Sequence, residues 1–167
     1  SLLANTGLIL NNDTSAGIGF GGQFTVQPTL TAGTDGIVCS FQVPSGSTTQ
    51  TARSLIIKGV RVSGGVTTAL TGGPVLYSYS LAYGHTAVSL ATTEAATTKA
   101  PRRIPLGYET FAATAAVGVI STAPSFQFTA PVVVGPGEFV AICAKNLGIV
   151  TSAGLITFQI TFDAYFE

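Results

Sequence analysis

Apolar and polar residues alternate with a period of two along most of this chain. The clearest case is residues 156–166, where isoleucine and phenylalanine at even positions alternate with threonine and glutamine at odd positions. Successive side chains of a β-strand point to opposite faces, so this pattern predicts a strand with one apolar and one polar face. The same alternation predicts strands over residues 24–30, 37–43, 75–83, 111–119 and 126–134.

Two further strands are predicted from apolar runs. Residues 54–62 are apolar on both parities, which is typical of a central strand covered on both faces, and residues 139–145 form a shorter run. Stretches rich in glycine and proline predict turns at residues 32–36, 44–47, 63–65, 72–74 and 135–137. No helical stripe of ten residues is present, and residues 91–100 offer at most one helical turn.

Eight or nine such strands predict an all-β domain, a two-layer β-sandwich. The long connection over residues 90–107 indicates a crossing between the two sheets, which favours a jelly roll over a meander. An immunoglobulin-like sandwich is the alternative, although the chain has no tryptophan for the Cys–Trp–Cys pattern of immunoglobulin domains.

The first 22 residues differ from the rest of the chain. They are apolar and rich in glycine, and Asp13 is their single charge. We expect residues 1–22 to be an N-terminal arm that contacts a neighbouring subunit, followed by a single β-sandwich domain over residues 23–167. The alternative is that residues 1–22 form a first strand of the same domain and a loop. The apolar side chains that would make the contacts are Leu2, Leu3, Leu8, Ile9, Leu10 and Phe20.

Charged residues make up 8% of the 167 residues, against roughly 25% in an average soluble protein, and the net charge is zero. This balance excludes the basic surface of a nucleic-acid or anionic-membrane binder, and 46% hydrophobic residues exclude a disordered chain. A surface with so little charge favours burial against other subunits. A secreted, threonine-rich single domain is the alternative. We expect no signal peptide and no membrane-spanning run.

Residues for catalysis or metal binding are sparse. His85 is the only histidine, the two cysteines are far apart, and the acidic residues are scattered singly. We therefore expect no catalytic residues, no cofactor and no metal. We expect His85 to be a partly exposed turn residue, which would make assembly sensitive to pH if it lay at a subunit contact.

The cysteines and tyrosines each allow two interpretations. Cys39 and Cys143 could form a disulfide. The alternation of apolar and polar residues on their two strands does not place their side chains on facing sides, so we expect two buried free thiols. Tyr77, Tyr79 and Tyr83 could form an exposed platform for a sugar ring. Because they share a parity with Val75 and Leu81, a core or interface stripe is favoured.

Arg102 and Arg103 lie between two prolines in the long connection, an extended and exposed setting. They would dock onto an acidic neighbour or remain in a solvated loop.

The segments KAPRRIPLG (residues 99–107) and FQFTAPVVVGPGEFV (residues 126–140), with the closing strand to Glu167, resemble small jelly-roll virion proteins of bacteriophages. The resemblance covers residues 99–167 and includes capsid, decoration and tail-associated proteins. It implies a self-assembling subunit without enzymatic activity, located in the virion. Its partners would be copies of itself, with a trimer as the state common in decoration proteins, and other virion proteins.

Two alternatives remain. The chain could be a subunit of a bacterial or archaeal extracellular filament that uses donor-strand exchange, with residues 1–10 as the donor. It could also be a carbohydrate-binding module, which requires an exposed aromatic platform. We expect no direct contact with nucleic acid and none with a membrane.

Overall fold

The computed structural model of the chain describes residues 20–26, 35–46, 51–87, 101–121, 125–148 and 153–167. Over these residues the secondary structure is entirely β. The strands are β1 (Phe20–Val26), β2 (Asp35–Gln42), β3 (Leu55–Thr71), β4 (Val75–His85), β5 (Arg102–Phe111), β6 (Ser125–Val134), β7 (Phe139–Asn146) and β8 (Ala153–Phe166). A helix with the length and apolarity needed to cross a bilayer does not occur in this described part.

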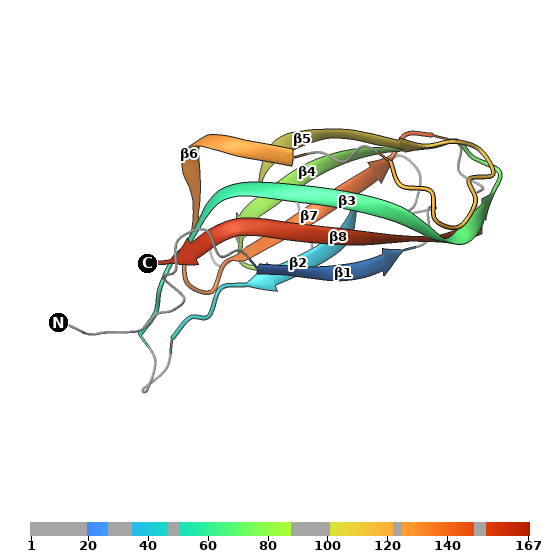
Figure 1. The fold of residues 1–167 in the computed structure, drawn as a ribbon. Coiled ribbons are helices and arrows are strands. Elements are labelled where there is room, and N and C mark those ends of the chain that lie inside the picture. The colour runs from blue at the N-terminus through green and yellow to red at the C-terminus, as the bar shows by residue number, and fades with distance from the viewer. Residues whose placement is uncertain (1–19, 27–34, 47–50, 88–100, 122–124, 149–152) are drawn as a thin grey trace.

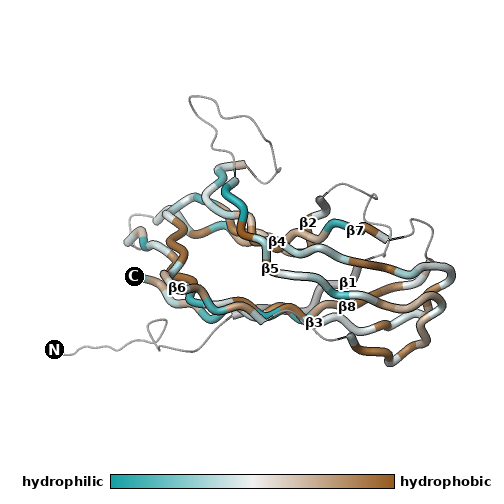
Figure 2. Tube along the Cα trace, turned by 90° about the horizontal axis from the view of Figure 1, so that it is seen from above, coloured by the Kyte–Doolittle hydropathy of each residue, from teal (hydrophilic) through white to brown (hydrophobic). Residues whose placement is uncertain are grey.

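The strands form two antiparallel four-stranded sheets, ordered β1-β8-β3-β6 and β2-β7-β4-β5. Figures 1 and 2 show them as two layers, so the predicted all-β sandwich is confirmed. Between successive described strands the chain changes sheet at every connection except the one from β4 to β5. Each sheet is therefore built from strands that are distant in the sequence.

The core lies between the sheets and follows the predicted alternation. On β8 the even-numbered residues Ile156, Phe158, Ile160 and Phe162 are buried, whereas Gln159 on the opposite face is exposed. The aromatic rings of Tyr77, Tyr79 and Phe158 meet at the centre, with ring centroids 5.6–5.9 Å apart. The predicted core stripe on β4 is therefore confirmed, since Tyr77 and Tyr79 are buried and Tyr83 packs half-buried against the core.

Strand β3 confirms one prediction and corrects another. Leu55, Ile56 and Ile57 are all buried, and β3 lies between β8 and β6, as expected for a central strand. The predicted turn at residues 63–65 is wrong, because β3 continues through Gly64 and Gly65 to Thr71. Gly64 serves there to make room for Glu109 and Phe158 rather than to reverse the chain.

The predicted strand at residues 111–119 is also wrong. Strand β5 ends at Phe111, and residues 112–121 form turns that run beside the distal half of β3. Two backbone hydrogen bonds of 2.9 Å hold them there, from the amide of Val66 to the carbonyl of Val119 and from the amide of Leu70 to the carbonyl of Ala115. Apolar residues alternate along this loop as they would along a strand. The period of the pattern alone therefore does not distinguish the two structures.

The long connection is shorter than predicted, because residues 102–107 belong to β5. Its predicted crossing between the two sheets is wrong, because β5 pairs with β4 in the same sheet. Pro105 lies within β5 and pairs with Ser80. Proline lacks an amide hydrogen and is tolerated in edge strands, and β5 is the last strand of its sheet. The helical turn considered at residues 91–100 lies outside the described residues.

The predicted arm is described only at its end. Phe20 begins β1, and residues 20–22 pair with residues 160–162 of β8. Leu2, Leu3, Leu8, Ile9 and Leu10 lie outside the described residues.

Candidate functional site

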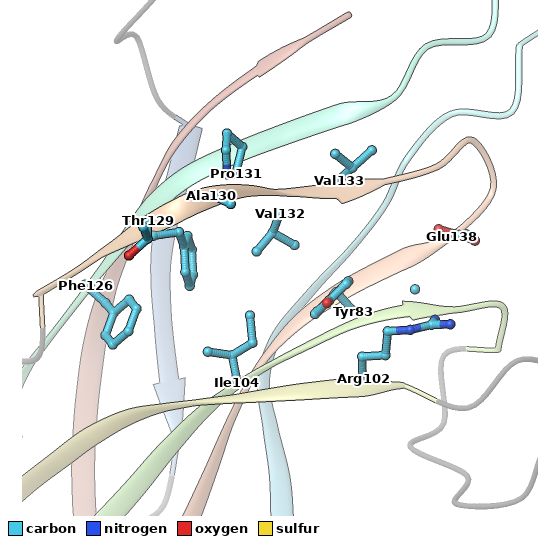
Figure 3. Close-up of a pocket in the computed structure, with 12 residues that line it drawn as sticks. Tyr83, Arg102, Ile104, Phe126, Thr129, Ala130, Pro131, Val132, Val133 and Glu138 are labelled. Atoms are coloured by element: carbon cyan, nitrogen blue, oxygen red, sulfur yellow. The ribbon is translucent and has the colours of Figure 1, made fainter.

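A groove of about 510 Å³ opens between the edge strands β5 and β6 (Figure 3). Each is the last strand of its own sheet; over the described residues β5 pairs with β4 and β6 pairs with β3, and their outer edges face away from the sheets. We call this feature the edge groove. It is lined by Tyr83, Gly84, Arg102, Ile104, Phe126, Phe128, Thr129, Ala130, Pro131, Val132, Val133 and Glu138.

A break in the pairing of β6 shapes one wall of the edge groove. Gln127 pairs with Gly59 and Val132 pairs with Ile57, so residues 128–131 stand opposite the single residue Lys58. The extra residues arch β6 away from β3, as bulges do at sheet edges. Pro131 lies in this arch, where the amide hydrogen that it lacks is not needed for the ladder.

The walls of the edge groove come from both sheets and combine apolar side chains with polar atoms that are at least as exposed. In Figure 3, Ile104 of β5 lies across the gap from Val132 and Phe126 of β6. The rings of Phe126 and Phe128 have centroids 5.1 Å apart, and both remain partly exposed. Apolar side chains at the open end of a sandwich leave a continuation of the core uncovered.

One end of the edge groove carries charge. Arg102 is exposed, and its Nη1 atom lies 3.2 Å from the position that a Cβ on Gly84 would occupy, so the guanidinium packs against the β4 backbone. Glu138 lies at the same end, where its Oε1 accepts a 2.8 Å hydrogen bond from the amide of Gly135. The groove therefore combines apolar side chains along its walls with two opposite charges, Arg102 and Glu138, at one end (Figure 3).

The two arginines singled out from the sequence have different surroundings. Both are exposed and extended, as predicted, but Arg102 alone lines the edge groove. Arg103 lies close enough to His85 to lower its pKa. Phe20, another predicted contact residue, is on β1 at the opposite edge of the sheet from β6. The three predicted contact residues that the structure describes are therefore not gathered in one place.

His85 is buried, which corrects the expectation of a partly exposed turn residue. It ends β4, and its ring stacks on Phe139 with centroids 5.6 Å apart and an angle of 22° between the planes. Burial, followed by the charge of Arg103, lowers the pKa of His85, and Glu138 acts in the opposite direction. The imidazole is therefore kept neutral at pH 7.

The interior holds an acidic residue that the sequence did not single out. Glu109 of β5 is 2% exposed, and its carboxyl group accepts hydrogen bonds from the hydroxyl of Tyr79 at 2.7 Å and the amide of Gly64 at 3.3 Å. Burial raises the pKa of Glu109 to about 7, against the lowering effect of these two bonds. Glu109 and Phe111 are two positions apart on the same strand, so their side chains point to the same face. This spacing was the available indication in the sequence that Glu109 faces the core.

The two cysteines are buried free thiols, as predicted. Cys39 stands opposite Ile142 and packs in the main core, whereas Cys143 stands opposite Ile37 and packs with Ala82 and Ala141 on the other face of the sheet. A disulfide is excluded by this arrangement, because the sheet backbone separates the side chains. No group of three or more potential metal ligands occurs among the described residues.

A second apolar surface lies on the loop between β5 and β6. Val117 is 63% exposed and Ile120 is 72% exposed, with Val119 beside them. Large apolar side chains that remain exposed together on one loop are typical of interaction surfaces.

Comparison of the chain with protein-family models and with curated proteins finds no match.

Proposed function

We propose that this chain is a non-enzymatic structural subunit of a bacteriophage particle, of the capsid, decoration or tail-associated type. It assembles with copies of itself and with other virion proteins. The observation that carries the proposal is the edge groove, an opening with apolar side chains between two strands whose outer edges pair with no further strand among the described residues. Free strand edges promote association, and an assembled particle would use them.

The order of the strands supports a jelly roll as the fold. Six of the seven connections between described strands change sheet, so strands 1, 8, 3 and 6 share one sheet and strands 2, 7, 4 and 5 share the other. Eight strands wound in this way form the two Greek keys of a jelly roll. An immunoglobulin-like sandwich keeps more hairpin neighbours in one sheet, in the order ABED and CFG.

The surface supports an assembling subunit. Charged residues are 8% of the chain, and the outer face of β8 presents Gln159 and Thr161 beside Asp163, whose charge is paired with Lys58. Val117 and Ile120 add exposed apolar area on a loop. Such a surface repels its own copies very little, which favours contacts between subunits.

The edge groove also favours a second candidate, a filament subunit that uses donor-strand exchange. In that mechanism an extended segment of one subunit completes the sandwich of the next. A carbohydrate-binding module has less support, because Tyr77 and Tyr79 are buried and do not form an exposed platform.

The assembly state of the purified chain tests the proposal. We expect light scattering to detect oligomers and electron microscopy to show closed or disc-like particles. Open filaments whose formation requires residues 1–10 would favour the second candidate. A monomer that stays monomeric at high concentration and binds glycans would overturn both.

A further inference from the structure

We infer that the edge groove binds residues 8–10 of a second copy of this chain, with Asp13 of that copy facing Arg102. This inference rests on the proposed function and names the contact through which copies join. The groove presents apolar side chains from both sheets, so we expect an incoming segment to be apolar on both of its faces. Among the described residues no further strand pairs with the outer edges of β5 and β6, so the segment is best extended, with its backbone paired to β5 or β6.

Residues 8–10 have the required chemistry. Leu8, Ile9 and Leu10 are three consecutive apolar residues, preceded by Gly7 and followed by Asn11. In an extended segment Leu8 and Leu10 point to one side and Ile9 points to the other. Both sides would therefore meet apolar wall, Ile104 from one sheet and Phe126 from the other.

The charges are complementary. Asp13 is the single charged residue among residues 1–22, and it follows Leu10 by three positions, about 10 Å in an extended chain. Arg102 precedes Ile104 by two positions on β5, about 7 Å along the strand. A segment seated on Ile104 therefore brings its carboxylate to the end of the groove where Arg102 is exposed. Glu138 at that end keeps its negative charge while its Oε1 accepts a hydrogen bond from the Gly135 amide, so Asp13 is expected to approach Arg102 on the side away from Glu138.

The position of β1 favours a second copy over the same chain. Phe20, Phe162, Val60 and Phe126 form one row across the sheet, so Phe20 stands three strand spacings, about 14 Å, from the groove strand β6. To fill its own groove, the chain before Phe20 would have to cross the whole sheet and turn around its edge. A neighbour whose β1 edge faces this β6 edge delivers its residues directly. This head-to-tail contact is heterologous and closes into a ring or continues as a filament.

Cross-linking between two single-cysteine variants tests the inference. Ile9→Cys is made in one full-length chain and Thr129→Cys in a second, affinity-tagged chain, because Thr129 is an exposed residue of the groove wall. The two are mixed, assembled and treated with a short bismaleimide. Thr68→Cys replaces Thr129→Cys as the matched control, since Thr68 is also an exposed threonine and lies outside the groove. The native cysteines stay, because both are buried.

We expect cross-linked dimers of the tagged and untagged chains at least fivefold above the Thr68→Cys control. Equal yields in both mixtures would overturn the inference. A link formed within single chains of an Ile9→Cys/Thr129→Cys double variant, without links in the mixture, would also overturn it and assign the groove to the chain's own segment. Particles that assemble without the link contradict this inference alone. A chain that never assembles contradicts the proposed function as well.

A charge exchange provides a second measurement. Arg102→Glu is expected to reduce the cross-linked fraction by roughly twofold to fivefold, the range of an exposed ion pair. Adding Asp13→Arg should restore it, whereas Asp13→Arg in the native background should reduce it again. If the double variant is as weak as either single variant, Asp13 and Arg102 do not face each other.

Discussion

The hydroxyl of Tyr79 donates a 2.7 Å hydrogen bond to Oε1 of Glu109 inside the sandwich. The two residues come from the adjacent strands β4 and β5, and both are almost fully buried. The bond ties the edge strand β5, which carries Arg102 and Ile104 of the edge groove, to the centre of the core. The carboxyl group is thereby held in a setting where its charge is costly.

The first prediction concerns pH. Burial raises the pKa of Glu109 in the folded chain to about 7 from its ordinary value of 4.5. The carboxyl group of Glu109 therefore loses its proton at a lower pH in the unfolded chain than in the folded chain. The stability that the neutral carboxyl contributes is complete below pH 4.5 and is lost as the pH rises through about 7. The difference corresponds to about 3 kcal/mol. Urea unfolding at pH 5 and pH 8 should show this loss in the native chain and not in Glu109→Gln. An identical pH profile in the two proteins contradicts it.

The second prediction compares two tyrosines. Tyr79→Phe removes the bond to Glu109 and should lower the free energy of unfolding by about 1–3 kcal/mol. Tyr77→Phe is the matched control, because the buried hydroxyl of Tyr77 has no hydrogen-bond partner among the described residues. Its removal should be neutral or stabilising. Equal losses in thermal or chemical unfolding would show that the hydrogen bond is not the cause.

The third prediction uses two neighbouring glycines of β3. A Cβ at Gly64 would lie 3.0 Å from Oε1 of Glu109 and 3.0 Å from a ring carbon of Phe158, so Gly64→Ala should destabilise the fold by about 1–3 kcal/mol. A Cβ at Gly65 would meet Ile120 at an ordinary 3.7 Å. Gly65→Ala should therefore be tolerated. The ranking of the two variants in a thermal melt decides the point.

The fourth prediction concerns the thiols. Burial raises the pKa of Cys39 to about 11, and Cys143 is fully buried on the other face of its sheet. Neither should react with a thiol reagent in the native chain at pH 8, and both should react after unfolding. The native chain should also show no internal disulfide after mild oxidation. Rapid labelling of two thiols under native conditions is the contrary result.

Much of the fold could be predicted from the sequence, because the alternation of apolar and polar residues that marks a strand depends only on residues close together in the chain. Strands β2, β4, β6, β7 and β8 were predicted close to their observed bounds, since each alternates or runs apolar between turn residues. The errors came where long-range contacts override local pattern. Gly64 resembles a turn residue but makes room for Phe158, and residues 112–121 alternate like a strand but lie as a loop against β3.

The candidate site was less predictable. Arg102 was singled out from its setting between two prolines, but the residues that accompany it come from β4, β6 and the turn before β7. These residues come together only because β5 and β6 are the last strands of their sheets. The pairing of strands that are distant in the sequence cannot be read from the alternation of apolar and polar residues within one strand. The arch at residues 128–131 depends likewise on the register against β3. Glu109 was overlooked because a single acidic residue in a strand is normally on the wet face.

By itself, the sequence determined that the chain is all-β, that its strands have one apolar and one polar face, and that charge contributes little to its surface. These properties depend on neighbours in the chain and on composition. The tertiary structure alone decided that β5 and β6 end their sheets side by side, that the edge groove opens between them, and that Glu109 lies against Tyr79. Those relations join residues that are distant in the sequence, because strand order and register are set by the packing of the whole core.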